Sequence, residues 1–461
     1  MTVMAFSPEA DLLIARTEAD AVLAIRREDK GPSERRAPLA PKQIASLAGA
    51  AGLKFAIESS DRRVFTNRDY AEAGATVVPS LCRPPVILGV KEPDPERLVP
   101  GATYLVFAHV TKGQPSNMPL LRRMQKLGCT LIDYEQIVDE AGRRLVFFGR
   151  HAGHAGAINA LWALGQRYLA EGTSTPFAEM KLAHEYTSLD AALAQVRAIG
   201  ARIRTEGLPA TLRPVIFAIA GSGHVSEGAE AVLEDLQPRE IGARELQEFS
   251  ATREVRHEVF LARLSRAARY HRIGGGAFDA ADYARHPHRF TSALERYLKH
   301  VTVFVNGTYW HDGLPRLIDN EQLDELWRAE AQPVLRVIAD ITCDVGGSIE
   351  ANVAATNPEA PVYVYTPVSR REDRMILPGV HGEGPVLMTV DNLPAQMPRE
   401  ASESFGDQLL PFIPELAACD WTRPLNRLSI GPELRRATIV HRGTLTPRFA
   451  HLHEAMNRAG A

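Results

Sequence analysis

The sequence predicts an α/β fold with parallel sheets, and three observations support this prediction. Short apolar runs alternate with stretches of helical pattern, which is the order of elements in parallel α/β sheets. Several of these runs end abruptly in charged residues, and one leads directly into a glycine-rich loop that opens a helix. The chain of 461 residues also has the length expected of two or three domains.

Strand-like runs dominate the first part of the chain. AVLAIRR at 21–27 is interpreted as a buried strand, and a polar, proline-containing loop then leads to a helix at KQIASLAGAAGL. FAIES and ATVVPS are expected to be strands separated by a helix around Tyr70. Three further apolar runs each lead into charged or polar residues: PPVILGV is followed by Lys91, TYLVFAHV contains His109 near its end, and CTLIDYE ends at 133–135. Ligands bind beyond the carboxyl ends of parallel strands, so these charged ends are candidate site residues.

A long apolar helix predicted at 151–172 connects these elements to a second domain. Small residues near its start allow a close approach to another backbone. After a helix near 187–199, the segments PVIFAIAG, VTVFVNG and VLRVIADITCD are predicted strands. The histidines of the segment 267–300 lack a metal-ligand spacing and are interpreted as surface residues. From about Asp391 we expect a return crossing followed by the helix SESFGDQLLPFIPELA.

The composition excludes several classes of protein. Apolar residues make up 45% and charged residues 24%, and the net charge of −3 gives no electrostatic support for nucleic-acid binding. Four well-separated cysteines without a CxxC pattern argue against a disulfide framework and against a bound metal. Acidic residues interrupt Met1–Arg27, and no run of eighteen apolar residues occurs. We therefore expect a cytoplasmic protein with no nucleic-acid or membrane partner.

The loop after PVIFAIA has the pattern of a dinucleotide site. Gly221 would make the tight turn and Gly223 would let the backbone approach a pyrophosphate, with Gly228 further along. The helix that follows would offer N–H groups and a partial positive charge to this anion. Ser226 occupies the usual third glycine position, and a glycine-rich turn without any ligand remains an alternative.

The residue that would distinguish NAD from NADP is not clear in the sequence. Glu240 lies near the expected distance of about 20 residues, but Arg239 and Arg244 stand beside it. A carboxylate would favour NAD and an arginine would favour the 2′-phosphate of NADP, so this choice stays open.

Lys91 and His109, eighteen residues apart, would share one cleft if their strands are neighbours. A lysine with a lowered pKa and a histidine are suited to building and breaking a carbinolamine and an imine. Glu92 could pair with Lys91 and hold it. Taken singly, Lys91 is interpreted as a surface lysine before a proline turn and His109 as a loop histidine with satisfied hydrogen bonds. Arginine binds carboxylates bidentately, and three doublets stand near strand or loop ends: Arg26–Arg27, Arg35–Arg36 and Arg143–Arg144.

A set of motifs occurs in one order along the chain, including ERRAPLAP, GVKEP, FAHVTKGQ, LIDYE, HAGHAGAIN, GSGHVSEGA, CDVGG and DNLPAQMPREAS. The chain thereby resembles the lysine–2-oxoglutarate reductase half of bifunctional aminoadipic semialdehyde synthases. More distantly, it resembles fungal lysine-forming saccharopine dehydrogenases and alanine dehydrogenases. The resemblance implies two Rossmann-like domains with an active-site cleft between them. Residues 1–148 with 395–461 would form the substrate domain, and 149–394 would bind the nicotinamide dinucleotide.

The same resemblance implies roles for individual residues. Lys91 and His109 match the acid–base pair of the family. Positions that line the substrate site are Glu34, Arg36, Glu92, Glu135, Arg144 and Asp344. Positions that hold the cofactor are Gly221, Ser222, Gly223, His224, Val225, Asn306, Gly307 and again Asp344.

The implied activity is the reductive condensation of lysine with 2-oxoglutarate to saccharopine, with NADP as the expected cofactor and NAD as the alternative. Because the oxidising half of the bifunctional enzymes is absent from this sequence, another protein would consume the product. The direction of the reaction and homo-oligomer formation are left open. Other hypotheses are a reductase for opines or polyamines, an alanine-dehydrogenase-like enzyme and a non-catalytic dinucleotide-binding protein.

Overall fold

The chain is organised around two separate eight-stranded sheets, each in its own structural unit. Unit 1 comprises 1–148 with 398–461, and unit 2 comprises 149–397. The computed structural model describes residues 22–82, 86–249, 255–367 and 376–458. Most of Met1–Arg27, where the sequence predicts no export signal, lies outside these residues. Within them, none of the helices combines the length and the hydropathy of a bilayer-spanning segment.

The sheet of unit 1 has the order β18-β17-β6-β5-β4-β1-β2-β3. The strands from β6 to β3 run parallel, and β17 and β18 extend the sheet in antiparallel pairing. The strands are β1 (Leu23–Ile25), β2 (Phe55–Glu58), β3 (Thr76–Val78), β4 (Val86–Lys91), β5 (Thr103–Phe107), β6 (Thr130–Asp133), β17 (Thr438–His441) and β18 (Thr444–Leu445).

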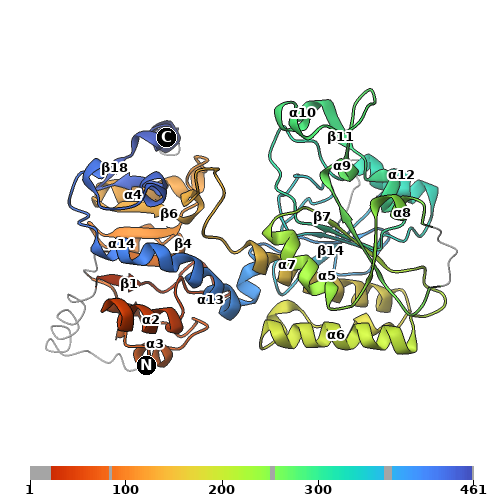
Figure 1. Cartoon of the computed structure of the whole chain (residues 1–461), viewed down its shortest axis with the longest axis horizontal. Helices are drawn as coiled ribbons and strands as arrows, with labels where there is room; N and C mark the ends of the chain where they lie inside the picture. The colour runs from red at the N-terminus through yellow and green to blue at the C-terminus, as the bar shows by residue number, and fades with distance from the viewer. Residues whose placement is uncertain (1–21, 83–85, 250–254, 368–375, 459–461) are drawn as a thin grey trace. The chain divides into compact units, whose positions relative to one another are not determined.

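Helices cover both faces of this sheet (Figure 1). One apolar core lies under α2 (Pro41–Ala51), α3 (Asn67–Glu72), α13 (Pro398–Leu409), α14 (Ile413–Ala418) and α15 (Pro432–Ala437). A second lies under α4 (Met118–Lys126) and α16 (Leu452–Arg458). The two chain segments of unit 1 meet in the first core, where Phe148 and Phe405 stack with ring centroids 4.3 Å apart. The backbone N–H of Ala37 also donates to Ser402 Oγ at 2.9 Å.

The sheet of unit 2 has the order β15-β14-β16-β13-β12-β7-β9-β8. It is parallel from β16 to β8 and antiparallel at β14 and β15. The strands are β7 (Ile216–Ala220), β8 (Arg239–Ile241), β9 (Phe260–Leu264), β12 (Val303–Asn306), β13 (Val337–Asp340), β14 (Val362–Tyr365), β15 (Ile376–Pro378) and β16 (Val386–Met388). A separate hairpin pairs β10 (Tyr270–Arg272) with β11 (Phe290–Ser292).

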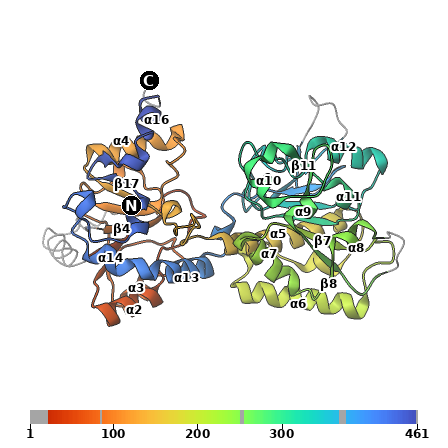
Figure 2. The same cartoon turned by 45° about the horizontal axis from the view of Figure 1, so that its top comes forward.

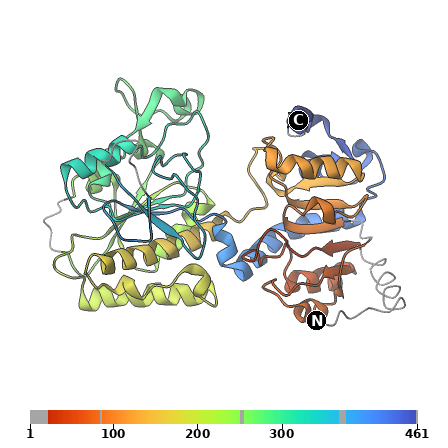
Figure 3. The ribbon, with the colours of Figure 1, turned by 180° about the vertical axis from the view of Figure 1, so that it is seen from behind.

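Two helical layers enclose the sheet of unit 2. Figure 2 shows α5 (Gly149–Ala170), α6 (Leu189–Glu206) and α7 (His224–Glu234) on one face. On the other lie α8 (Ala243–Gln247), α9 (Arg266–Arg269), α10 (Ala280–Arg285), α11 (Glu295–Leu298) and α12 (Asn320–Ala329). The reverse view in Figure 3 shows α5 and α6 running together beneath the sheet. Helix α6 begins after Ser188, whose side chain accepts from Ala191 N at 3.1 Å, and ends at Gly207 in a positive-φ conformation.

The predicted α/β fold of two Rossmann-like domains is confirmed, with one correction at the sheet edges. The sequence predicts parallel sheets, but four edge strands are antiparallel: β14, β15, β17 and β18. Short edge strands carry little sequence signal, and doubly wound sheets commonly add antiparallel edge strands of this kind.

Candidate functional site

Lys91 and His109 lie at the same edge of the unit 1 sheet, because β4 and β5 are parallel neighbours. Lys91 is opposite Phe107 in the register, after an irregularity that follows Leu88. His109 has a positive φ of 49°, and its carbonyl accepts from Asn117 Nδ2 at 3.0 Å. The imidazole stacks on the Phe107 ring with centroids 6.3 Å apart. The structure thus brings these two predicted site residues to neighbouring strand ends.

Glu92 fixes the orientation of the His109 ring. Its carboxylate accepts from His109 Nδ1 at 3.2 Å and from Lys30 Nζ at 2.6 Å. Burial alone would raise the pKa of Glu92, but these two hydrogen bonds, with a backbone hydrogen bond and the charge of His109, outweigh burial and lower the pKa to about 2. An ionised acceptor at Nδ1 favours the tautomer with a proton there, which leaves Nε2 to exchange protons. These contacts join Glu92 to Lys30 and His109, and the suggestion from the sequence that Glu92 also holds Lys91 stays a prediction.

A buried ion cluster holds the backbone at the end of β4. Glu28 accepts from the N–H groups of Val90 at 2.7 Å and Lys91 at 3.0 Å. Arg26 donates to Glu28 at 3.0 Å and to the Lys91 carbonyl at 3.3 Å, and it also pairs with Asp29 at 2.6 Å. Burial raises the pKa of Glu28. Sequence reasoning missed Glu28 and Asp29, because acids in a polar loop give no signal of a partner 60 residues away.

The other predicted substrate residues of unit 1 form two ion pairs with different accessibility. Arg36 and Glu34 are buried and joined by two hydrogen bonds of 2.5 and 2.8 Å, and the guanidinium lies 4.3 Å from the centroid of the Phe148 ring. Arg144 and Glu135 pair at 3.0 Å, but the Arg144 side chain is 52% exposed. Exposed pairs contribute little energy, so Arg144 can exchange its partner more readily than Arg36.

Asp133 at the end of β6 is a buried carboxyl that the sequence marked only as a strand end. One oxygen accepts from Glu135 N at 2.9 Å, and the other has no hydrogen-bond partner among the described residues. Burial raises the pKa of Asp133 to about 7. This acid lies opposite Val106 in the register, close to the strand end that carries His109.

The glycine loop of unit 2 follows β7 directly, as the sequence predicts. Gly221 has a φ of 127°, and a Cβ there would collide with Ser226 Oγ. Ser226 is buried, and its hydroxyl lies 3.4 Å from the carbonyls of Ala220 and Gly307. Ser226 therefore ties the first turn of α7 to the ends of β7 and β12, in the place where the fingerprint has a third glycine.

Gly223 and Gly228 have different roles: the first leaves space for a ligand, and the second allows α5 and α7 to pack closely. Gly223 precedes α7 without a side-chain cap, and a Cβ there would meet nothing within 4 Å. Gly223 is exposed, and the open space beside it at the start of a helix fits a pyrophosphate. Gly228 faces α5, and a Cβ there would collide with the Arg150 carbonyl. Ser222 and His224 are exposed and Val225 is half-buried, so the loop can present its backbone to a ligand.

Asn306 at the end of β12 has its side chain engaged within the protein. Its Nδ2 donates to Asp340 and to Ser348 Oγ, both at 2.8 Å. Its Oδ1 accepts from the N–H and the hydroxyl of Thr308. Any contact of this strand end with a cofactor would therefore use the backbone of Asn306 and Gly307.

Asp340 at the end of β13 is the centre of this network and was not singled out from the sequence. Besides Asn306, Thr342 Oγ1 donates to it at 2.7 Å and Asn352 Nδ2 at 2.8 Å. Burial raises the pKa of Asp340, and the three donors oppose that effect. The exposed Asp344 lies in the turn that follows, where the Gly347 N–H donates to its carbonyl at 2.8 Å.

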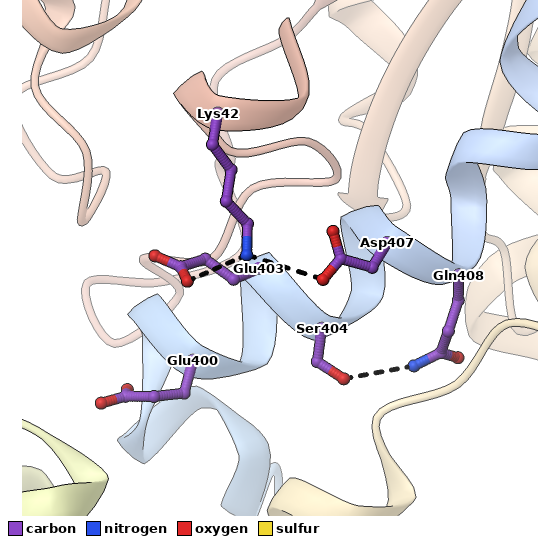
Figure 4. Close-up of a pocket in the computed structure, with 6 residues that line it drawn as sticks. All are labelled: Lys42, Glu400, Glu403, Ser404, Asp407 and Gln408. Carbon is purple, nitrogen blue, oxygen red and sulfur yellow. Dashed lines mark hydrogen bonds and ion pairs between the residues drawn. The ribbon is translucent and has the colours of Figure 1, made fainter. Parts of the chain in front are cut away.

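A separate open depression of about 530 Å³ contains none of the predicted site residues (Figure 4). Lys42 on α2 pairs there with Glu403 at 3.2 Å and Asp407 at 3.5 Å, both on α13. Its lining side chains are mostly satisfied by one another, so we assign it no catalytic role. Among the residues that the structure describes, no group of three or more His, Cys, Asp or Glu side chains is arranged to hold a metal ion.

Comparison with known proteins identifies the family. Residues 24–155 match the family model described as "Alanine dehydrogenase/PNT, N-terminal domain". The chain is 36% identical over 446 residues to the mitochondrial alpha-aminoadipic semialdehyde synthase of Mus musculus, which covers 94% of this chain and 48% of that protein. This chain thus spans about half the length of that relative. It is 30% identical over 418 residues to the saccharopine dehydrogenase [NAD(+), L-lysine-forming] of Neurospora crassa, covering 87% of this chain and 92% of that protein.

Solved structures agree on the fold. An L-alanine dehydrogenase superposes with a TM-score of 0.59 at 18% identity, covering 94% of this chain and 99% of that chain. The resemblance inferred from the motifs is confirmed by the sequence relatives. Because the match to the Neurospora crassa protein reaches 30% identity over most of both sequences, the chain belongs to the family of the L-lysine-forming saccharopine dehydrogenases.

Proposed function

We propose that this chain condenses L-lysine with 2-oxoglutarate and reduces the imine to saccharopine, in a reaction that is reversible. The observation that carries the proposal is the position of Lys91 and His109 at adjacent strand ends, with the His109 ring held by Glu92. The names of the relatives, an alpha-aminoadipic semialdehyde synthase and a lysine-forming saccharopine dehydrogenase, support this choice of substrates.

The proposed chemistry requires protons to move at the carbinolamine. The ε-amine of lysine attacks the keto carbon of 2-oxoglutarate, and loss of water then gives the imine. His109 Nε2 accepts and returns these protons, while Glu92 stabilises the imidazolium through Nδ1. Lys91 serves as the second acid, and the buried Arg26–Glu28 pair keeps its backbone in place.

Carboxylates of the substrates are held by arginine side chains in this proposal. Arg144 is the more accessible, since its partner Glu135 lies in a partly exposed pair that a substrate carboxylate can replace. Arg36 is already paired with the buried Glu34. In this proposal the two side chains together form a polar surface of the substrate site. Both arginines belong to unit 1, to which we assign the substrate.

We assign the nicotinamide dinucleotide to unit 2. The backbone of Gly221, Ser222, Gly223, His224 and Val225 would hold the pyrophosphate, and Asn306, Gly307 and Asp344 would border the nicotinamide. The bound dinucleotide would supply the hydride that reduces the imine. We propose NADP as the preferred form of this dinucleotide.

The experiment is to mix purified protein with lysine, 2-oxoglutarate and NADPH, and to follow the absorbance of the reduced nicotinamide. Oxidation that requires both substrates supports the proposal. The variant His109→Ala should lower turnover roughly 100-fold or more and leave dinucleotide binding unchanged. His453→Ala, at an exposed histidine of α16 in the same unit, is the matched control.

Two outcomes would contradict the proposal. An unchanged rate in His109→Ala would remove His109 from acid–base catalysis. Reaction with pyruvate or other amines, without any reaction of lysine and 2-oxoglutarate, would retain the hydride chemistry and reject these substrates.

A further inference from the structure

The strand beside β7 in the unit 2 sheet is β9, although β8 comes first along the chain. Ala220 at the end of β7 is in register with Leu264 at the end of β9, so the two strands finish level with each other. A dinucleotide on the glycine loop spans the point where the strand order reverses, which here lies between β7 and β12. Its nicotinamide half would extend toward β12 and its adenosine half toward β9.

The candidates that sequence spacing suggested for the adenosine ribose lie on the outer strand β8 or in α8, which follows it. Glu240 on β8 is one strand further from the glycine loop, and it is paired with Arg263 at 2.8 Å. Arg239 and Arg244 each pair with a glutamate at or near α8, at 2.7 and 3.1 Å. A count of about 20 residues from the glycine loop does not locate the residue that contacts the adenosine ribose, because the chain forms the edge strand β8 before it forms β9 beside β7.

The residues that directly follow β9 are Ser265 and Arg266, and the first acidic residue after this strand is Asp279. The Ser265 Oγ accepts from Ala268 N at 3.3 Å, so its hydroxyl proton can be donated to a ligand. Arg266 is exposed, and its guanidinium lies 5.5 Å from the centroid of the Tyr283 ring. In the part of the chain that the structure describes, no carboxylate lies within ion-pair distance of Arg266.

We propose that Ser265 and Arg266 form the subsite that recognises the 2′-phosphate of NADP. An NAD site places a carboxylate at this position to accept from the ribose hydroxyls, and β9 is followed by none. A phosphate instead needs a cation and hydrogen-bond donors, which are what these two side chains offer. This inference rests on the proposed dinucleotide site of unit 2 and adds the residues that select the dinucleotide.

The test measures binding of NADP⁺, NAD⁺ and adenosine 2′,5′-bisphosphate by calorimetry, in the full chain and without substrates. Wild type should bind NADP⁺ more tightly than NAD⁺. Arg266→Ala should weaken NADP⁺ and the bisphosphate by roughly 10- to 100-fold, the loss expected for a charge-assisted contact, and leave NAD⁺ within about twofold. Ser265→Asp keeps a good helix cap for α9 and should weaken NADP⁺ by like-charge repulsion without weakening NAD⁺.

Arg244→Ala on the rival segment is the matched control, since this arginine is also exposed and follows β8. The proposal is overturned if Arg244→Ala reduces NADP⁺ affinity while Arg266→Ala does not, or if wild type prefers NAD⁺. Selective NADP⁺ binding without turnover of lysine and 2-oxoglutarate would support this subsite and contradict the proposed function. Turnover that is equally good with NADH, with no preference in binding, would do the reverse.

Discussion

Replacement of Asp340 by alanine should destabilise unit 2 by about 3–5 kcal/mol. The substitution removes the acceptor for three donors, and the loss differs among them. Asn352 Nδ2 loses the acceptor that it has in Asp340, whereas Asn306 Nδ2 retains Ser348 at 2.8 Å. Thr342 is half-buried and can turn toward water. A buried donor left unpaired costs about 1–3 kcal/mol, and the lost charge-assisted bonds add to that cost.

The isosteric variant Asp340→Asn provides an internal comparison. Asn352 Oδ1 is buried without a hydrogen-bond partner among the described residues, so rotation of the Asn352 amide would let this oxygen accept from the new amide. We therefore expect a loss of only about 1–2 kcal/mol for Asp340→Asn. Urea unfolding followed by fluorescence measures both variants, with Asp312→Ala at an exposed site of unit 2 as the control. Equal stability of Asp340→Ala and wild type would refute this account of the network.

Three further predictions concern stability. The pKa of Glu92 is about 2 in the folded protein, below its unfolded value of 4.5. The ionised carboxylate therefore stabilises the fold above pH 4.5, and this stabilisation is lost as the pH falls toward 2. Urea unfolding of Glu92→Gln should show a loss of up to about 3 kcal/mol at neutral pH that narrows below pH 4.5. The pKa of Asp133, about 7, lies above its unfolded value of 3.8, so ionisation destabilises the fold as the pH rises between these values. Asp133→Asn should gain up to about 4 kcal/mol above pH 7, and greater stability of wild type at every pH would contradict this. Thermal unfolding should show that Gly228→Ala, which collides with the Arg150 carbonyl, costs about 1–3 kcal/mol, whereas Gly223→Ala leaves stability unchanged and weakens dinucleotide binding.

The sequence was sufficient to bring Lys91 and His109 together, for a general reason. Parallel strands end at one edge of a sheet, so residues that close successive strands become neighbours without any detailed knowledge of packing. The glycine loop was equally accessible, because its strand, turn and helix are consecutive in the chain.

Contacts between distant segments could not be read in the same way. Lys30 reaches Glu92 from a loop 62 residues earlier, and nothing in the local pattern indicates that ion pair. The order of strands in the sheet places β9 beside β7. Sequence spacing alone indicated β8 as the strand that carries the residues for the adenosine ribose. In the sequence, Asp340 is only the last residue of an apolar strand. Its hydrogen-bond partners come from another strand end and from the turn that follows, so the local pattern does not indicate them.

The discontinuity of unit 1 has a consequence for synthesis on the ribosome. Phe405 and the apolar side chains of α13 and α14 complete the core that contains β1, β4 and β5, yet they emerge only after all of unit 2. At the usual pace of translation, roughly 12–50 seconds separate residues 148 and 398. During this interval the residues of unit 2 are being made, and the nascent first segment exposes an apolar sheet face that α13 and α14 have yet to cover. A holdase chaperone could bind this exposed apolar face. A circular permutant that joins the two segments of unit 1 would remove the delay.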